Sequence, residues 1–375
     1  MVSWLTGSDS LGLVAGDPGR IHAEGLRARV AIEQARAEVA TLIGARSREI
    51  VFTSGATESI AAATWGAVRR AVEAGRRPHV VLAAVEHSAV RRSAATFAEA
   101  FGGHVTIVGV DGLGRIDADR LLHAVHPETA LVHVQWGNHE VPTLQPVAEV
   151  VAACRAQGVL VHVDAAQAVG RVPVDVTALG VDLLSASGHK FGAPAGTGML
   201  FVRRGLRLAP LLEGGDQERA RRAGLENTPG IVGLGAVAVA LTTRTDDGEP
   251  RLRHEERASY ALTDRLLGGL IAVAGVHLLG DTTEAGRLPH SVCVSIDGVE
   301  PQGVLLGLDQ AGVAAHSGSA CSSESLEPSP VLEAMGVDAH RSLRLSVGWD
   351  TTDTDVGAAL AAVPDVVARL RALVP

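Results

Sequence analysis

The chain has 375 residues, of which 46% are hydrophobic and 20% are charged, a balance typical of a globular enzyme with a large core. Its length predicts two or three domains, or one large domain with a smaller one appended. A formal net charge of −9 argues against a general surface for nucleic acid or anionic membranes, and no apolar run approaches the roughly 20 residues that span a bilayer.

The first part of the chain alternates short strands with helices. After a helix at Ile21–Ala45, a strand is expected at Glu49–Thr53, and a second helix follows from Ser54-Gly55-Ala56-Thr57. Further strands are predicted near His79–Val85, His104–Val110, Ala130–Gln135, Val159–Val163, Asp182–Ser185 and Gly198–Val202, and helices near Ser88–Phe101, Asp117–Val125 and Gln145–Gln157. This alternation predicts an α/β domain with a mostly parallel sheet.

A polar, turn-rich stretch at Asp246–Pro250 separates this part from the rest of the chain. A long helix is predicted at Arg251–Ala272, and the short strands expected beyond it are His277–Leu279, Ser291–Ile296, Val313–His316 and Ser342–Val347. This pattern predicts a smaller α+β domain. We therefore expect a large domain at residues 15–246 and a small domain at residues 247–375, together with the N-terminal residues 1–14.

Among the 33 lysines and arginines of the chain, Lys190 is the only lysine. A lysine can lose its proton and become a nucleophilic amine, whereas a guanidinium stays protonated in proteins. Such an amine forms Schiff bases with carbonyls, including the aldehyde of pyridoxal phosphate. The alternative is that one lysine survived by chance in an arginine-rich chain. Its neighbours in Ser185-Ala186-Ser187-Gly188-His189-Lys190 argue against chance.

Two further segments have the chemistry that this cofactor needs. Asp164 ends a strand where α/β folds place ligands, and a protonated pyridine nitrogen would satisfy a buried carboxylate there. Gln167 could then donate to the phenolic oxygen of the ring. The turn Ser54–Thr57 lies between a strand and a helix, where backbone N–H groups and the helix dipole bind phosphate. The alternative for both segments is ordinary helix capping.

The three cysteines are widely spaced and form neither a disulfide framework nor a metal-ligand cluster, so a reducing cytoplasm is the simplest setting. The histidines show no HExxH spacing, so zinc is not expected. Cys154 and Cys293 lie in apolar patterns and are expected to be buried. Cys321 has small polar residues on both sides, which predicts an accessible loop where a thiolate can react.

Five segments together resemble the aminotransferase class V family of pyridoxal phosphate enzymes and, more narrowly, the cysteine desulfurases. They are Phe52-Thr53-Ser54-Gly55-Ala56-Thr57-Glu58-Ser59, Glu86-His87-Ser88-Ala89-Val90, Asn138-His139-Glu140 followed by Gln145-Pro146, His162-Val163-Asp164-Ala165-Ala166-Gln167, and Ser187-Gly188-His189-Lys190. The string around Cys321 resembles the catalytic loop of the NifS/IscS-like desulfurases. The resemblance extends from Ile21 to Thr352.

This resemblance implies a type I pyridoxal phosphate-dependent transferase fold, in which Lys190 is the Schiff-base lysine and Cys321 the nucleophile that becomes a persulfide. The resemblance also implies contacts with the cofactor or its phosphate for Ala56, Thr57, Ser187 and His189. It implies that His87 stacks on the pyridine ring, and that Asp164 and Gln167 are the partners of the ring nitrogen and the ring oxygen. Asn138 is implied to be a contact near substrate and cofactor, and Arg344 to clamp the substrate carboxylate. The implied substrate is L-cysteine, the implied partner is a sulfur-acceptor protein, and the implied assembly is a homodimer.

The sequence also departs from the family. The usual N-terminal string Tyr-Leu-Asp-Asn-Ala-Ala-Thr-Thr has no counterpart near Met1–Gly7, and Leu225 stands where the family has a threonine that reaches the phosphate of the partner subunit. A selenocysteine lyase or another C–S β-lyase, in which Cys321 matters less, and a non-catalytic scaffold therefore stay open. Iron–sulfur assembly, tRNA thiolation, DNA phosphorothioation and thio-metabolite synthesis would each fit as the destination of the sulfur.

Overall fold

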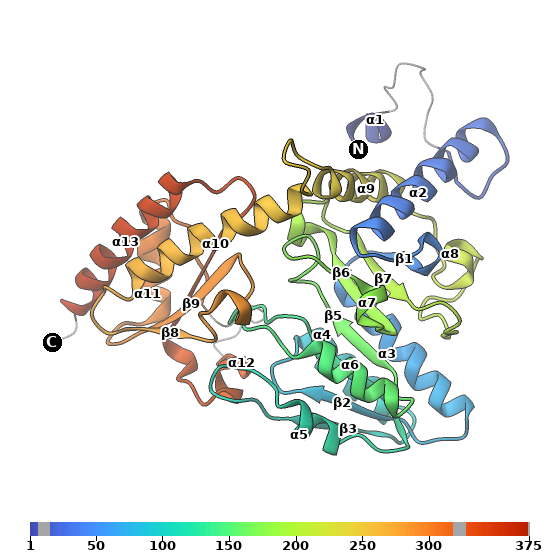
Figure 1. Cartoon of the computed structure of the whole chain (residues 1–375), viewed down its shortest axis with the longest axis horizontal. Helices are drawn as coiled ribbons and strands as arrows, with labels where there is room; N and C mark the ends of the chain where they lie inside the picture. Colours follow the sequence, from blue (N-terminus) through green and yellow to red (C-terminus); the bar gives the residue numbers. More distant parts are fainter. Residues whose placement is uncertain (7–15, 318–327, 374–375) are drawn as a thin grey trace.

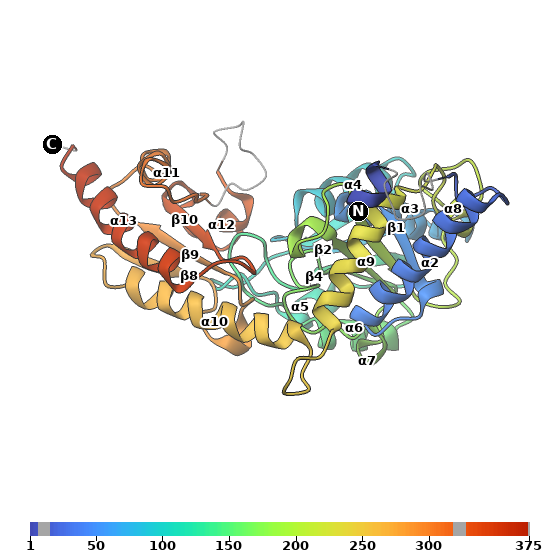
Figure 2. The same cartoon turned by 90° about the horizontal axis from the view of Figure 1, so that it is seen from above.

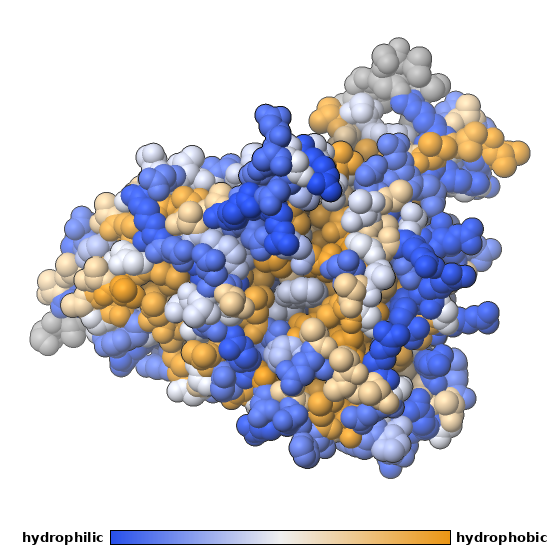
Figure 3. Space-filling model, in the orientation of Figure 1, coloured by the Kyte–Doolittle hydropathy of each residue, from blue (hydrophilic) through white to orange (hydrophobic). Residues whose placement is uncertain are grey.

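The computed structural model describes residues 1–6, 16–317 and 328–373. They form a large lobe and a small lobe, which the long helix α10 (Arg251–Leu270) connects (Figures 1 and 2). On the face shown in Figure 3, hydrophobic residues are visible toward the middle, whereas hydrophilic residues predominate at the edges. Among the described residues, no helix has both the length and the apolar character needed to cross a membrane.

A seven-stranded sheet forms the centre of the large lobe. Its strands lie in the spatial order β1-β7-β6-β5-β4-β2-β3. Their bounds are β1 Ile50–Thr53, β2 His79–Ala83, β3 His104–Val108, β4 Thr129–Gln135, β5 Val161–Asp164, β6 Leu183–Ser187 and β7 Gly198–Val202. The strands β3, β2, β4, β5 and β6 pair in parallel, and β7 runs antiparallel to both β6 and β1. The prediction of a mostly parallel sheet is confirmed.

Helices cover both faces of this sheet, which is why its strands read as nearly continuous apolar runs. They are α2 Ala23–Leu42, α3 Ala56–Glu73, α4 Ser88–Glu99, α5 Ala118–His123, α6 Val147–Ala156, α7 Val176–Leu179, α8 Gln217–Ala220 and α9 Thr228–Thr242. The side chains of β1 alternate between two cores: Phe52 packs in the core shared with α2 and α9, and Val51 packs against α3. Helix α4 covers β2 on the α3 side.

The small lobe has its own sheet and its own hydrophobic core. Its three antiparallel strands lie in the order β10-β9-β8, and helices α10, α11 and α13 pack on them. The bounds of these elements are β8 Val276–Leu279, β9 Ser291–Ile296, α11 Pro301–Gln310, α12 Pro330–Ala334, β10 Ser342–Ser346 and α13 Asp353–Arg371. Val331 and Leu332 of α12 reach across to the core of the large lobe. The domain boundary predicted near residue 246 falls between α9 and α10 and stays a prediction.

Two expectations from the sequence need correction. The strand predicted at Val313–His316 is absent from the described residues, because the Val313 N–H bonds the Leu308 carbonyl at the end of α11 and only His316 pairs with Arg344. The N-terminal residues were assigned to the small domain, but helix α1 (Val2–Thr6) packs on α9 in the large lobe (Figure 1). The Arg27 guanidinium lies 5.3 Å from the centroid of the Trp4 ring and helps to hold α1 there.

The segment labelled α8, which follows β7, contains a left-handed turn and is not a regular α-helix. Glu218, Arg219 and Ala220 have φ angles of 49°, 60° and 58°, a region that residues with a Cβ rarely occupy. The buried Glu218 carboxylate fixes the turn, because it accepts hydrogen bonds from Arg36 Nη1 and Nη2 at 2.5 and 2.7 Å and from the Phe52 N–H at 2.9 Å. The Ala220 side chain is exposed and adds no buried contact of its own.

Ala220→Gly is expected to stabilise the protein by about 0.5–1 kcal/mol. Glycine adopts this φ without the steric penalty of a Cβ, and this gain exceeds the cost of the greater conformational entropy that glycine gives the unfolded chain. Urea unfolding followed by circular dichroism measures the change. The control is Ala37→Gly at an exposed site within α2, which should lose about 1 kcal/mol because glycine disfavours helix interiors. Equal destabilisation by both substitutions would contradict the role assigned to the turn.

Candidate functional site

A cavity of about 580 Å³ lies at the carboxyl ends of β4, β5 and β6, where α/β folds place their ligands. Residues from the start of α3, the ends of these strands and the small lobe line it. The predicted site residues that line this cavity are Ala56, Thr57, His87, Asp164, Gln167, Ser187, His189, Lys190 and Arg344. Asn138 does not line it, and Cys321 lies outside the described residues.

One end of the cavity is a set of hydrogen-bond donors. Helix α3 begins at Ala56, so its first N–H groups have no partner within the helix and point out of its N-terminus. Gly198 brings β7 against this turn, because a Cβ on Gly198 would lie only 2.5 Å from the Gly55 Cα. The Ser187 hydroxyl, 3.0 Å from His189 Nδ1, lies on the neighbouring strand end. Burial and nearby Lys190 lower the pKa of His189. This end suits a phosphate group.

Asp164 supplies a negative charge on the wall of the same cavity. It is the last residue of β5, and its side chain is largely buried. Its Oδ1 accepts hydrogen bonds from the Ala166 N–H at 3.1 Å and the Ser185 hydroxyl at 3.3 Å. Within the described part of the chain, Oδ2 accepts no hydrogen bond, so it can receive one from a protonated ring nitrogen. The N–H donors at the start of α3 suit the phosphate of pyridoxal phosphate, and the carboxylate acceptor of Asp164 suits its ring nitrogen. The cavity therefore has both kinds of group that this cofactor requires.

Glu86 is a second buried acid near Asp164. It is fully buried, and its Oε1 accepts the Gln135 N–H at 2.8 Å. Burial, reinforced by the charge of Asp164, raises the pKa of Glu86 to about 8. Glu86 is therefore mainly protonated at neutral pH. Sequence reasoning assigned no role to Glu86, although it stands beside His87 in one of the quoted segments.

His290, immediately before β9, fixes the orientation of Gln167. Its Nε2 lies 3.1 Å from Gln167 Oε1, and because an amide oxygen only accepts, this nitrogen is the donor. Burial, with a contribution from Arg171, lowers the pKa of His290 to about 3, so the ring is neutral. The Gln167 amide NH₂ group is thereby left for an acceptor in the cavity. No motif marks His290, so sequence reasoning missed it.

Lys190 lies on a short 3-10 turn, Gly188–Phe191, directly after β6. Its backbone carbonyl accepts hydrogen bonds from Arg171 Nε at 3.1 Å and Nη2 at 2.8 Å. Arg171 thus fixes the backbone of the turn while the lysine side chain remains exposed toward the cavity. Sequence reasoning also missed this clamp, because Arg171 and Lys190 are separated by a strand.

Arg344 of β10 brings a cation from the small lobe. Its Nη1 donates to the His139 carbonyl at 2.6 Å, which ties β10 to the large lobe. Among the described residues, its Nε and Nη2 make no hydrogen bond, so they remain available to a carboxylate.

The side chain of Asn138 is hydrogen-bonded within the protein. Its NH₂ group donates to the Val85 carbonyl and to Gln135 Oε1, and its Oδ1 accepts from the N–H groups of Glu140 and Val141. These hydrogen bonds join Asn138 to the protein around the cavity, and its contact with substrate and cofactor stays a prediction.

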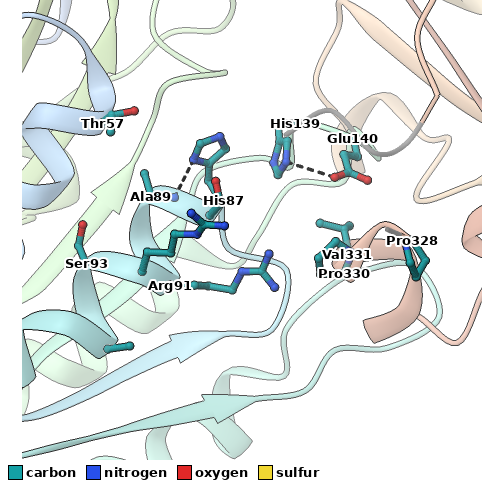
Figure 4. Close-up of a pocket in the computed structure, with 13 residues that line it drawn as sticks. Thr57, His87, Ala89, Arg91, Ser93, His139, Glu140, Pro328, Pro330 and Val331 are labelled. Carbon is teal, nitrogen blue, oxygen red and sulfur yellow. Dashed lines mark hydrogen bonds and ion pairs between the residues drawn. The ribbon is translucent and has the colours of Figure 1, made fainter. Parts of the chain in front are cut away.

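His87 caps α4 and borders the same space. Its Nδ1 accepts the Ala89 N–H at 3.1 Å, so the proton of the neutral ring is on Nε2. Its ring lies edge to face with that of His139, with 5.0 Å between the centroids. Beyond these two histidines, a second cavity of about 630 Å³ opens between α4 and residues 328–331 (Figure 4).

The other cysteines and a cluster of histidines lie away from these cavities. Cys154 and Cys293 are buried as predicted, and burial raises the pKa of their thiols to about 11 and about 12. His79, His104 and His126 come together at β2 and β3, although their sequence spacing did not predict it. Their rings stack, and both nitrogens of His79 hydrogen-bond threonine hydroxyls, an arrangement unlike converging metal ligands.

Comparison with known proteins covers nearly the whole chain. Residues 10–358 match the model of one protein family, described as aminotransferase class-V. The chain is 42% identical to a cysteine desulfurase of Gluconacetobacter diazotrophicus, over 96% of this chain and 88% of the relative. It is 40% identical to cysteine desulfurase IscS of Methanosarcina thermophila, over 96% of this chain and 87% of the relative.

Solved structures show the same similarity in three dimensions. A NifS-like protein matches with a TM-score of 0.82 and 30% identity, covering 95% of this chain and 92% of that one. DndA from Streptomyces lividans matches with a TM-score of 0.74 and 34% identity, covering 92% and 94%. SspA, solved in complex with cysteine, matches with a TM-score of 0.75 and 30% identity, covering 90% and 92%.

Proposed function

The chain belongs to the aminotransferase class-V family and is a cysteine desulfurase, and from this premise we propose how its residues divide the work. The observation that supports the proposal is the meeting of Lys190, Asp164 and Arg344 at one cavity, each from a different element. An amine, a buried carboxylate and a carboxylate clamp are the groups that an enzyme of this class needs around an amino-acid substrate.

The cavity fits pyridoxal phosphate by the chemistry of its donors and acceptors. We assign Thr57, Ser187 and His189, with the start of α3, to the phosphate, and Lys190 to the covalent link. Asp164 would pair with the ring nitrogen, Gln167 would donate to the ring oxygen, and His87 would stack on the ring face. When bound, the cofactor provides an electron sink for negative charge at the substrate Cα.

The remaining steps belong to the protein's own side chains. Arg344 binds the carboxylate of L-cysteine and orients the substrate, and the Lys190 amine removes the proton from Cα. The proton that Lys190 takes up can return from its ammonium group to the departing product, and the Nε2–H of His87 can donate a hydrogen bond within the site. The Cys321 thiolate attacks the substrate sulfur, so that a new S–S bond forms as the C–S bond breaks, and alanine leaves. The flanking sequence supports this role for Cys321.

The proposed setting is a cytoplasmic homodimer that hands its sulfur to an acceptor protein. Two free cysteines buried in apolar surroundings are consistent with a reducing compartment. Leu225 is 65% exposed and Leu212 is 41% exposed on the same lobe, which suits a surface that a second subunit covers. Leu225 offers no hydroxyl, so the partner's phosphate would lose a contact that a threonine provides.

The test compares L-cysteine, L-selenocysteine and L-cystine as substrates of the cofactor-loaded protein. With L-cysteine we expect alanine and sulfane sulfur in equal amounts, and mass spectrometry should find a persulfide on Cys321. Faster turnover of selenocysteine without a persulfide would instead favour a lyase. A visible absorbance band that does not change on addition of cysteine would point to a scaffold.

A further inference from the structure

The second cavity, which we call the α4 pocket, adjoins the catalytic cavity. The two share Thr57, His87 and His139, so a molecule in the α4 pocket would lie directly beside the catalytic cavity. Its far wall is Pro328, Pro330 and Val331 (Figure 4). At about 630 Å³ it is larger than a single amino acid needs, and cysteine already has a cavity with its own carboxylate clamp.

Two adjacent arginines of α4 line this pocket. Figure 4 shows Arg91 extending from the helix into the space that faces Pro330 and Val331. Arg91 is half-buried and Arg92 is exposed. In the described ranges, neither guanidinium makes a hydrogen bond or an ion pair, in contrast to Arg36, whose partner is a buried carboxylate. Unpaired guanidinium groups in a concave site are suited to binding anions.

Glu140, the only carboxylate among the described residues that line the α4 pocket, does not neutralise these arginines. It accepts a hydrogen bond from the Ser329 hydroxyl, and its Oε1 lies 3.4 Å from His139 Nε2. The pocket is therefore a positive region on a chain whose formal net charge is −9. A molecule that enters here would be selected by negative charge, since the rest of an acidic surface repels it.

We propose that the α4 pocket binds the sulfur acceptor, and that the acceptor is a protein segment whose receiving cysteine is flanked by acidic side chains. The proposal rests on the desulfurase function proposed above. The acceptor thiolate attacks the outer sulfur of the Cys321 persulfide, the S–S bond to Cys321 breaks, and a persulfide forms on the acceptor. The Cys321 thiolate is regenerated, so the transfer needs no oxidant or reductant. Arg91 and Arg92 hold the flanking carboxylates.

The probes are two synthetic peptides, one with a cysteine between two aspartates and one with asparagines in their place. We expect the enzyme to transfer sulfur to the aspartate peptide roughly tenfold faster at low salt, since two arginine–carboxylate pairs form. This preference should decrease at high salt, because salt screens exposed charges. The double variant Arg91→Gln/Arg92→Gln should transfer to both peptides at the same rate. Its alanine yield in a single turnover, with no peptide present, should be unchanged.

Arg76→Gln/Arg77→Gln is the matched control, because this adjacent pair also has one half-buried and one exposed arginine but lies beyond the far end of α3. It should keep the preference. Equal rates for both peptides with the native enzyme would overturn the proposal. Mercaptosuccinate, a small thiol with two carboxylates, stands for a small-molecule acceptor. A preference for mercaptosuccinate with no preference for the aspartate peptide would also overturn the proposal. If no alanine forms in the single turnover, the desulfurase function itself fails, and the two failures are thereby distinguished.

Discussion

Cys321→Ser is expected to lower the production of alanine and sulfide from L-cysteine by about 10³-fold or more, while the absorbance of the bound cofactor is unchanged. A serine hydroxyl stays protonated at neutral pH and does not attack a thiol sulfur, whereas a thiolate does. The measurement pairs amino-acid analysis for alanine with the visible spectrum of the same sample. Cofactor loading thus serves as an internal check that the site still folds.

The other two thiols are not able to replace Cys321. Cys154 and Cys293 are buried, and with pKa values of about 11 and about 12 they hold almost no thiolate at neutral pH. Cys154→Ala is therefore the control, and it should retain turnover. Sustained desulfuration by Cys321→Ser would assign the chain to the C–S β-lyases, which release sulfur without an enzyme persulfide.

The large-lobe half of the site could be predicted from the sequence, because parallel strands impose its geometry. Asp164 and Lys190 are far apart in the chain, yet β5 and β6 pair in parallel with Asp164 opposite Ser185. Residues that follow buried strands in an α/β pattern must meet at one edge of the sheet. A strand pattern and a lone lysine therefore sufficed to predict that both residues would line one cavity.

The small-lobe half depended on tertiary packing that no local pattern encodes. Arg344 reaches the cavity because β10 docks through the His139 carbonyl, and only the family resemblance suggested it. His290 of the small lobe acts through one long-range hydrogen bond to Gln167, and in the large lobe Arg171 likewise acts at long range, through two hydrogen bonds to the Lys190 carbonyl. The predicted strand at 313–316 failed for a related reason, since the Val313 N–H completes a helix end.

Lys190→Arg is expected to lose the visible absorbance band of the lysine-bound cofactor and to lower desulfuration by about 10³-fold or more. The substitution keeps the positive charge and the approximate length of the side chain, so it separates the need for charge from the need for an amine. A guanidinium does not lose its proton at accessible pH, and it therefore neither links to an aldehyde nor removes a proton from Cα.

The fold should tolerate this change, because Arg171 holds residue 190 through the backbone carbonyl and not through its side chain. Lys190→Ala is the matched control, and it removes both the amine and the charge. If the amine is what matters, both variants lose the band to the same extent, although only Lys190→Arg keeps the positive charge. An intact absorbance band in Lys190→Arg would mean that the one lysine of this chain is not the residue that holds the cofactor.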